Sequence, residues 1–215
     1  MSALKPLGEW FGGLPQVILM DLDGTLVDSA ADIALSLNRA LADLGLGAVT
    51  EAQVRDWVGR GAARLIEVAL QHVVPHHAQD PQKHAVEARL LAAFMVRYQD
   101  SVCEASTVYP GVAEFVATAR AAGIRLACVT NKPYRPAVAL LEALNLLDAF
   151  ELVIGGDSLL HKKPHPEPLL HCLRHFEVTA AQALMIGDSR NDVDAAKAAG
   201  VKSLALPYGY NHGEP

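Results

Sequence analysis

The chain has 215 residues and a net charge of −6, with three cysteines and no cluster of lysine or arginine. This length fits one large domain, or a core with a smaller insert, and is enough to bury a hydrophobic core. The acidic balance argues against a nucleic-acid partner. An odd number of widely spaced cysteines argues against a disulfide framework and is typical of a reducing compartment. Because no signal-peptide pattern or membrane-length apolar run occurs, we expect a soluble, cytoplasmic protein without a membrane partner.

The first predicted strand is the apolar run Val17–Met20, which is typical of a buried parallel strand. Beyond it, helical patterns continue without a convincing strand, so we expect an all-helical cap over residues 29–107. Its helices are predicted at residues 30–44, 51–58, 62–72 and 81–101. The last of these should begin with Asp80 as N-cap and Pro81 at the first helical position.

After the cap, strands and helices alternate along the chain. Strands are predicted at residues 124–129, 152–154, 183–186 and 203–206, and helices at 134–144, 167–176 and 191–199. This alternation indicates βαβ units and a parallel sheet. The predicted fold class is therefore α/β: a Rossmann-like core formed by residues 1–28 and 108–215, with the helical cap inserted at 29–107.

Polar residues follow the ends of the predicted strands. They are Asp21-Leu22-Asp23-Gly24-Thr25, Thr130-Asn131-Lys132, Lys162-Lys163 and Gly187-Asp188 through Asp192. Taken singly, these segments are ordinary turns, surface lysines or a solvated helix N-terminus. With the first strand central in the sheet, however, all four segments converge at the topological switch point, where ligands of such sheets bind. Of the two lysines, Lys163 is preferred because Pro164 follows it.

Together these segments resemble the four motifs of the haloacid dehalogenase superfamily, and residues 29–107 are similar to the cap that this superfamily inserts after its first motif. Within the superfamily, residues 130–133, 163–166 and 208–214 resemble segments of the bacterial phosphoglycolate phosphatases. The resemblance implies a phosphatase that works through an aspartyl-phosphate, with Asp21 as nucleophile. Asp23 would be the general acid and then the general base.

The resemblance also implies which residues bind the phosphoryl group and a metal. The phosphoryl oxygens would be held by Thr130, the Asn131 backbone N–H and Lys163. The implied metal ligands are Asp21, the backbone carbonyl of Asp23 and Asp188, with Asp192 binding the metal or a metal-bound water. Two carboxylates about 4 Å apart repel by roughly 4 kcal/mol at an effective dielectric near 20. Four acids approached by a phosphate dianion therefore need a cation, and oxygen-only ligands favour Mg²⁺. The same crowding should raise the pKa of one carboxylate, which helps Asp23 carry a proton.

The cap should select the substrate. Gly59-Arg60-Gly61 permits a tight loop, and caps of this superfamily lower such a loop over the substrate. Arg60 or Arg64 could then meet a substrate carboxylate through bidentate hydrogen bonds, although each taken singly is more often solvated. His72, His76 and His77 lack an evident acidic or cysteine partner and are expected in a solvated loop, with His161 and His165 also at the surface or in packing roles.

The leading hypothesis is a Mg²⁺-dependent hydrolysis of 2-phosphoglycolate to glycolate and phosphate by a monomer or homodimer. The substrate could instead be another small phosphate ester, such as a sugar phosphate, or pyrophosphate. A phosphomutase shares the motifs but must shield the aspartyl-phosphate from water. A dehalogenase is disfavoured because it lacks the acid that corresponds to Asp23. A non-catalytic phosphate-binding protein is disfavoured because every catalytic position is filled.

Overall fold

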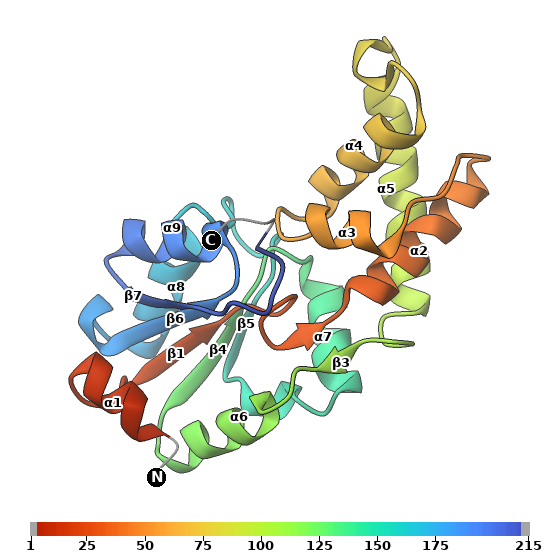
Figure 1. The fold of residues 1–215 in the computed structure, drawn as a ribbon. Helices are drawn as coiled ribbons and strands as arrows, with labels where there is room; N and C mark the ends of the chain where they lie inside the picture. The colour runs from red at the N-terminus through yellow and green to blue at the C-terminus, as the bar shows by residue number, and fades with distance from the viewer. Residues whose placement is uncertain (1–3, 212–215) are drawn as a thin grey trace.

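The computed structural model describes residues 4–211 and contains a five-stranded, fully parallel sheet (Figure 1). In spatial order the strands are β5 (Leu152–Ile154), β4 (Arg125–Val129), β1 (Val17–Met20), β6 (Ala183–Gly187) and β7 (Lys202–Ala205). From β1 the chain builds outward first to one side and later to the other. The switch point of the sheet therefore lies at the end of β1, as predicted.

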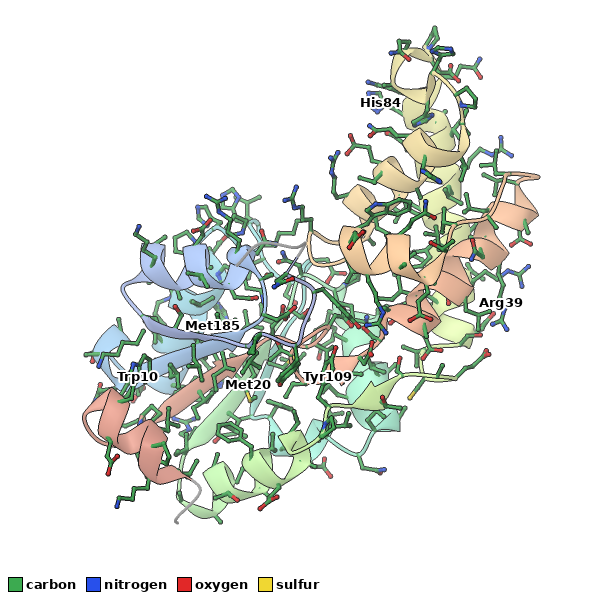
Figure 2. The ribbon with its side chains drawn as sticks, viewed as in Figure 1. Trp10, Met20, Arg39, His84, Tyr109 and Met185 are labelled. Atoms are coloured by element: carbon green, nitrogen blue, oxygen red, sulfur yellow. The ribbon has the colours of Figure 1, made fainter. Side chains whose placement is uncertain are left out.

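Helices cover both faces of the sheet. One face packs against α6 (Val112–Ala121), α7 (Tyr134–Ala143) and the short α1 (Lys5–Phe11). The other face packs against α8 (Glu167–Phe176) and α9 (Arg190–Ala199). Alternate strand residues enter the two layers, as expected for a strand buried on both sides. Met20 and Met185, both labelled in Figure 2, lie on neighbouring strands and belong to opposite layers.

The cap consists of four helices with a hydrophobic core of their own. They are α2 (Ala30–Asp43), α3 (Glu51–Trp57), α4 (Ala62–Val73) and α5 (Lys83–Asp100). A short 3₁₀ helix at His77–Gln79 also belongs to the cap, and two others, Leu147–Ala149 and Ala180–Gln182, lie in the core. Figure 1 shows the cap as one body beside the sheet, and Figure 2 places His84 at the end farthest from it. Within residues 4–211, no helix combines the length and apolar character that a membrane span requires.

An antiparallel ribbon of β2 (Val27–Asp28) and β3 (Thr107–Val108) joins the cap to the core. The two strands stand at the start and the end of the helical insert. Because the ribbon brings these ends together and the cap has its own core, we propose that residues 29–107 form a separate cap domain on a core of 1–28 and 108–215.

Two local features differ from the sequence prediction. Helix α5 begins at Lys83 and not at Pro81, because Asp80 Oδ1 accepts a hydrogen bond from the Gln82 N–H (2.7 Å) and closes a turn before the helix. The ribbon and α1 were not predicted. A strand of two residues is too short to show an alternating pattern, so sequence periodicity cannot reveal it.

Candidate active site

Polar side chains from the ends of β1, β4 and β6, from the loop after β5 and from the first turn of α9 meet at the carboxyl edge of the sheet. Each is at most 9% exposed, and the group comprises Asp21, Asp23, Thr130, Asn131, Lys132, Lys163, Asp188 and Asp192. The structure thus brings together the core residues that the sequence singled out. It also brings in Lys132, which follows Thr130 and Asn131 in the same motif.

Lys163 connects the carboxylates in this group. Its Nζ lies 3.0 Å from Asp21 Oδ1 and 2.6 Å from Asp192 Oδ1, and it also donates to the Val129 carbonyl. Burial acts to lower the pKa of Lys163, but Asp192 and Asp21 outweigh it and raise the pKa above its ordinary range. Lys162 Nζ points elsewhere and donates to the Arg60 carbonyl (2.9 Å). Lys163 is therefore the lysine that lies within reach of Asp21.

Asp188 is fixed by its neighbours. Its Oδ1 accepts from the Thr25 hydroxyl (2.6 Å), and its Oδ2 accepts from the Tyr210 N–H (2.6 Å). The backbone also closes around this carboxylate, because a Cβ added to Gly24 or Gly209 would collide with Asp188. These glycines allow the main chain to approach the carboxylate more closely than a larger residue would.

Asp192 lies in the first turn of α9. Its Oδ2 accepts from the Ser189 N–H (3.0 Å) and the Ser189 hydroxyl (2.8 Å). Asp21, Asp188 and Asp192 each offer one oxygen atom, and these atoms lie within 4.8 Å of one another. Three converging carboxylates with no nitrogen or sulfur donor are the chemistry that a hard divalent cation prefers, so the donor set fits Mg²⁺.

Two of these carboxylates, Asp21 and Asp188, have a pKa above the ordinary range. Burial, followed by the charges of Asp192 and Asp188 and opposed by Lys163, raises the pKa of Asp21 to about 8. Burial also raises the pKa of Asp188 to about 6, with Asp192 adding to the effect and Thr25 opposing it. The neighbouring negative charges contribute to both shifts, but removal from water is the larger cause. A divalent cation among these oxygens would favour their charged forms and lower both pKa values.

Asp23 has a different set of partners. Lys132 Nζ donates to its two oxygens at 2.8 and 2.9 Å, and the Ser29 hydroxyl donates to Oδ1. The same ammonium lies 4.7 Å from the centroid of the Tyr98 ring, which belongs to cap helix α5. Tyr98 had no distinguishing pattern in the sequence, whereas Lys132 could have been found from its place beside Thr130 at the end of β4.

A small pocket lies between this group and the cap. Its core side is lined by Asp21, Asp23, Thr130, Asn131, Lys132 and Pro133. Its cap side is lined by Ile33, Val58, Gly59, Gly61, Ala62, Leu65, Phe94, Met95 and Tyr98. The enclosed space measures about 50 Å³. Since one buried water occupies about 10–15 Å³ on this measure, the pocket has room for a few waters or one small ligand.

The cap loop Gly59-Arg60-Gly61 is held against the core through its backbone. The Gly59 carbonyl accepts from Asn131 Nδ2 (2.9 Å) and Asn191 Nδ2 (3.2 Å), and the Arg60 carbonyl accepts from Lys162. Gly61 has a φ of +87°, a backbone conformation that favours glycine. The loop therefore lies over the pocket, as predicted.

Neither cap arginine lines the pocket. Arg60 is exposed, and Arg64 pairs with Glu67 (2.6 Å) on the outer side of α4. Binding of a substrate carboxylate by Arg60 or Arg64 therefore stays a prediction, because neither side chain faces the pocket in this structure.

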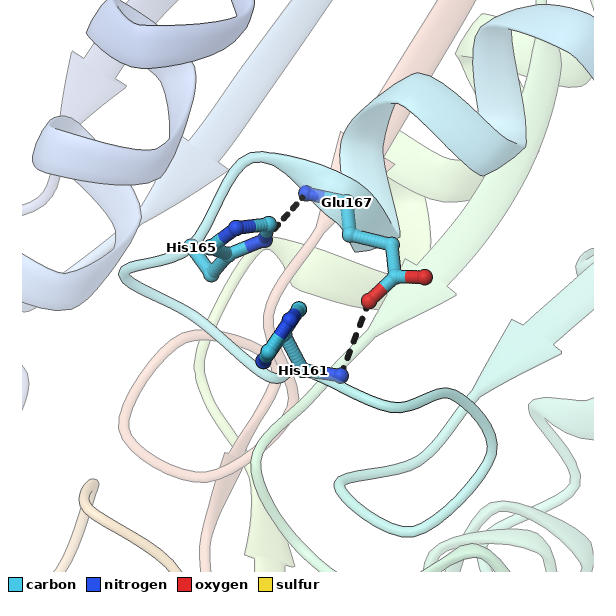
Figure 3. A group of neighbouring side chains, drawn as sticks. All are labelled: His161, His165 and Glu167. Atoms are coloured by element: carbon cyan, nitrogen blue, oxygen red, sulfur yellow. Dashed lines mark hydrogen bonds between the residues drawn. The ribbon is translucent and has the colours of Figure 1, made fainter.

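The histidines differ in their surroundings. His76 is exposed, but His77 is buried and its Nε2 lies 3.1 Å from Glu87 Oε1, so the prediction of a solvated His77 without an acidic partner was wrong. The contact crosses from the 3₁₀ turn to α5, which sequence proximity does not indicate. His161 and His165 gather at the surface with Glu167, the first residue of α8 (Figure 3), and two hydrogen bonds donated by backbone N–H groups order the loop.

Comparison with known proteins agrees with this geometry. The family of haloacid dehalogenase-like hydrolases matches residues 18–206. The chain is 45% identical over 199 residues to a phosphoglycolate phosphatase of Colwellia psychrerythraea, covering 93% of this chain and 87% of the relative. It is 44% identical over 199 residues to a phosphoglycolate phosphatase of Nitrosococcus oceani, with the same two coverages.

Solved structures show the same similarity. A predicted phosphoglycolate phosphatase from Haemophilus somnus superposes with a TM-score of 0.84 at 36% identity, over 93% of this chain and 88% of that one. CbbY from Rhodobacter sphaeroides, solved in complex with phosphate, superposes with a TM-score of 0.78 at 28% identity, over 94% and 90%. The expected superfamily and fold class are confirmed.

Proposed function

We propose that this chain, which belongs to the haloacid dehalogenase-like hydrolases, hydrolyses 2-phosphoglycolate to glycolate and inorganic phosphate. The observation that carries the proposal is the position of Asp21 beside Lys163 and two further carboxylates, at the floor of a small covered pocket. The substrate is inferred from the relatives, which this chain matches over most of their length.

Asp21 is suited to attack phosphorus because its carboxylate is held in place. Its Oδ1 accepts from the Leu22 N–H (2.7 Å) and contacts Lys163 Nζ. In the proposed first step, an Asp21 oxygen forms a bond to phosphorus while the ester P–O bond breaks. Asp23 gives its proton to the departing glycolate oxygen.

In the second step a water molecule attacks the aspartyl-phosphate at phosphorus. Asp23 takes a proton from this water, the bond between Asp21 and phosphorus breaks, and phosphate leaves with Asp21 restored. The Thr130 hydroxyl, the Asn131 backbone N–H and Lys163 would hold the phosphoryl oxygens. Their strand-end positions allow them to stabilise charge at the same place in both steps.

Asp21, Asp188, Asp192 and the Asp23 backbone carbonyl would hold Mg²⁺, which when bound supplies positive charge to the phosphoryl oxygens. The three carboxylates supply oxygen donors only, and none of them is more than 7% exposed. Their protein contacts keep them oriented without it: Thr25 and Tyr210 position Asp188, and Ser189 positions Asp192.

The test is phosphate release from a panel of esters by the purified protein with Mg²⁺. The panel contains 2-phosphoglycolate, 3-phosphoglycerate, glucose 6-phosphate and pyrophosphate, and the Asp21→Asn variant controls for contaminating phosphatases. We expect the highest kcat/KM for 2-phosphoglycolate. A kcat/KM at least tenfold higher for another member of the panel would contradict the proposed substrate.

A further inference from the structure

We propose that Lys132, together with the Tyr98 hydroxyl, binds the carboxylate of the substrate, and that this carboxylate replaces Asp23 as the partner of the Lys132 ammonium. The inference rests on the proposed function, because it assumes a substrate with a second anionic group. It assigns substrate selection to a core lysine and a cap tyrosine, and not to Arg60 or Arg64.

The positive charge that lines the pocket belongs to Lys132. Of the described residues that line the pocket, Lys132 is the one with a cationic side chain. Its side chain is 3% exposed, so its charge acts on the pocket with little screening by solvent. Lys163 is equally buried, but its three acceptors are Asp21, Asp192 and the Val129 carbonyl, all on the side of the phosphoryl chemistry.

The second argument is an unused donor beside this lysine. Tyr98 is 2% exposed and lines the pocket, and its hydroxyl, which lies beside the Lys132 ammonium, has no acceptor for its O–H among the described residues. A buried hydroxyl without a partner costs free energy, which a ligand acceptor would recover. An ammonium and a hydroxyl donor side by side, below the apolar cap residues Phe94 and Leu65, match the needs of a small carboxylate.

The third argument is the geometry of the substrate. In 2-phosphoglycolate one CH₂ and the ester oxygen separate the carboxylate carbon from phosphorus, so the two anionic groups must bind close together. Lys132 is two residues beyond Thr130, and its backbone N–H donates to the Thr130 hydroxyl (3.2 Å). The proposed phosphoryl and carboxylate sites therefore share one turn at the end of β4.

The ion pair between Lys132 and Asp23 links binding of the substrate carboxylate to catalysis. Lys132 now donates to both oxygens of Asp23. A substrate carboxylate that binds the Lys132 ammonium takes the place of Asp23. Asp23 is then free to approach the ester oxygen. An ester without a carboxylate leaves Asp23 held by Lys132, so the lysine discriminates in catalysis as well as in binding.

The experiment compares kcat/KM for 2-phosphoglycolate and ethyl phosphate, which has the same carbon number and no carboxylate. Lys132→Met should reduce the preference for 2-phosphoglycolate about 10- to 100-fold, the range expected for hydrogen bonds to a charged group. Lys162→Met is the matched control, because its ammonium bonds a backbone carbonyl outside the pocket, and it should leave the preference unchanged.

Tyr98→Phe is the second variant, and it removes one hydroxyl without leaving a buried charge unpaired. It should reduce the same preference about three- to tenfold, whereas Tyr109→Phe should not, because Tyr109 lies outside the pocket lining. Circular dichroism and thermal unfolding establish that each variant is folded.

The outcomes separate this proposal from the proposed function. A wild-type enzyme that shows no preference for 2-phosphoglycolate would overturn both. This inference alone would be overturned if the wild-type enzyme prefers 2-phosphoglycolate and Tyr98→Phe keeps that preference, while Lys132→Met either keeps it or does not fold. An equal loss for both esters in Lys132→Met would show that the lysine only positions Asp23, which would also overturn it.

Discussion

The two sides of the pocket differ in how their residues are held. On the core side Asp21, Asp188 and Lys163 are buried, and each has charged or hydrogen-bonding partners of its own. On the cap side Phe94 and Leu65 present apolar surface, and the loop over the pocket is tied down through backbone carbonyls. In the proposed mechanism the core side supplies the chemistry that is the same for every phosphate ester, while the shape of the cap side and the charge of Lys132, on the core side, select the ester.

Asp21→Asn is the variant that should separate the two sides most completely. It should lower kcat by at least about 10³-fold for every ester, because an amide cannot serve as the nucleophile. The fold should be retained, since the amide is nearly isosteric with the carboxylate. Steady-state kinetics test this, with Asp194→Asn on α9 as the control for an acidic residue outside the site. Turnover within tenfold of wild type, after deamidation is excluded, would contradict the assignment.

Removal of the metal should abolish the chemistry on the core side of the pocket and so affect all esters alike. EDTA should suppress turnover of all esters, and Mg²⁺ should restore it, whereas Ca²⁺ should restore little because it prefers more ligands and longer bonds. Mg²⁺ at about 100 times its Kd should also stabilise the wild-type fold by about 2.7 kcal/mol. Thermal unfolding checks this, with Asp188→Asn expected to lose most of the stabilisation. Full activity of metal-free protein would refute the argument from the carboxylates.

Lys163→Ala tests the core side by stability as well as activity. It leaves Asp21 and Asp192 without their shared cation, and the loss of one partner from a buried ion pair costs about 3–5 kcal/mol. Urea unfolding in EDTA should show this loss, while Lys162→Ala should stay within about 0.5 kcal/mol of wild type. Activity of Lys163→Ala should fall equally for 2-phosphoglycolate and ethyl phosphate. A loss confined to one ester would place Lys163 on the selective side of the pocket.

The smallest effect is expected at the tie between the cap loop and the core. Lys162→Met removes the hydrogen bond to the Arg60 carbonyl. We expect kcat/KM to fall about two- to tenfold, the range for one hydrogen bond, and to fall equally for both esters. Asn191→Ala, which removes a bond to the Gly59 carbonyl, should behave similarly. A change in preference between the esters would show that the loop itself takes part in selection.

The same two sides differ in how far the sequence predicted them. Asp21, Thr130, Lys163 and Asp188 follow strands whose apolar runs are evident, and parallel strands bring such ends together. The cap contacts depend on which way helices present their side chains across the pocket. Nothing in the local sequence places Tyr98 beside Lys132 or buries His77 against Glu87, because these contacts join segments that are distant in the chain or separated by a turn and are set by tertiary packing.

The most direct test of the account is the complex of the protein with beryllofluoride, a mimic of a phosphoryl group bound to a carboxylate. Fluorine NMR and a crystal structure of the complex would show where the group attaches. We expect one protein-bound fluoride species that requires Mg²⁺, is absent in Asp21→Asn, and is bonded to an Asp21 oxygen beside Lys163 and Thr130. Beryllofluoride bound at another residue, or bound equally well by Asp21→Asn, would contradict the assignment of Asp21 as the nucleophile.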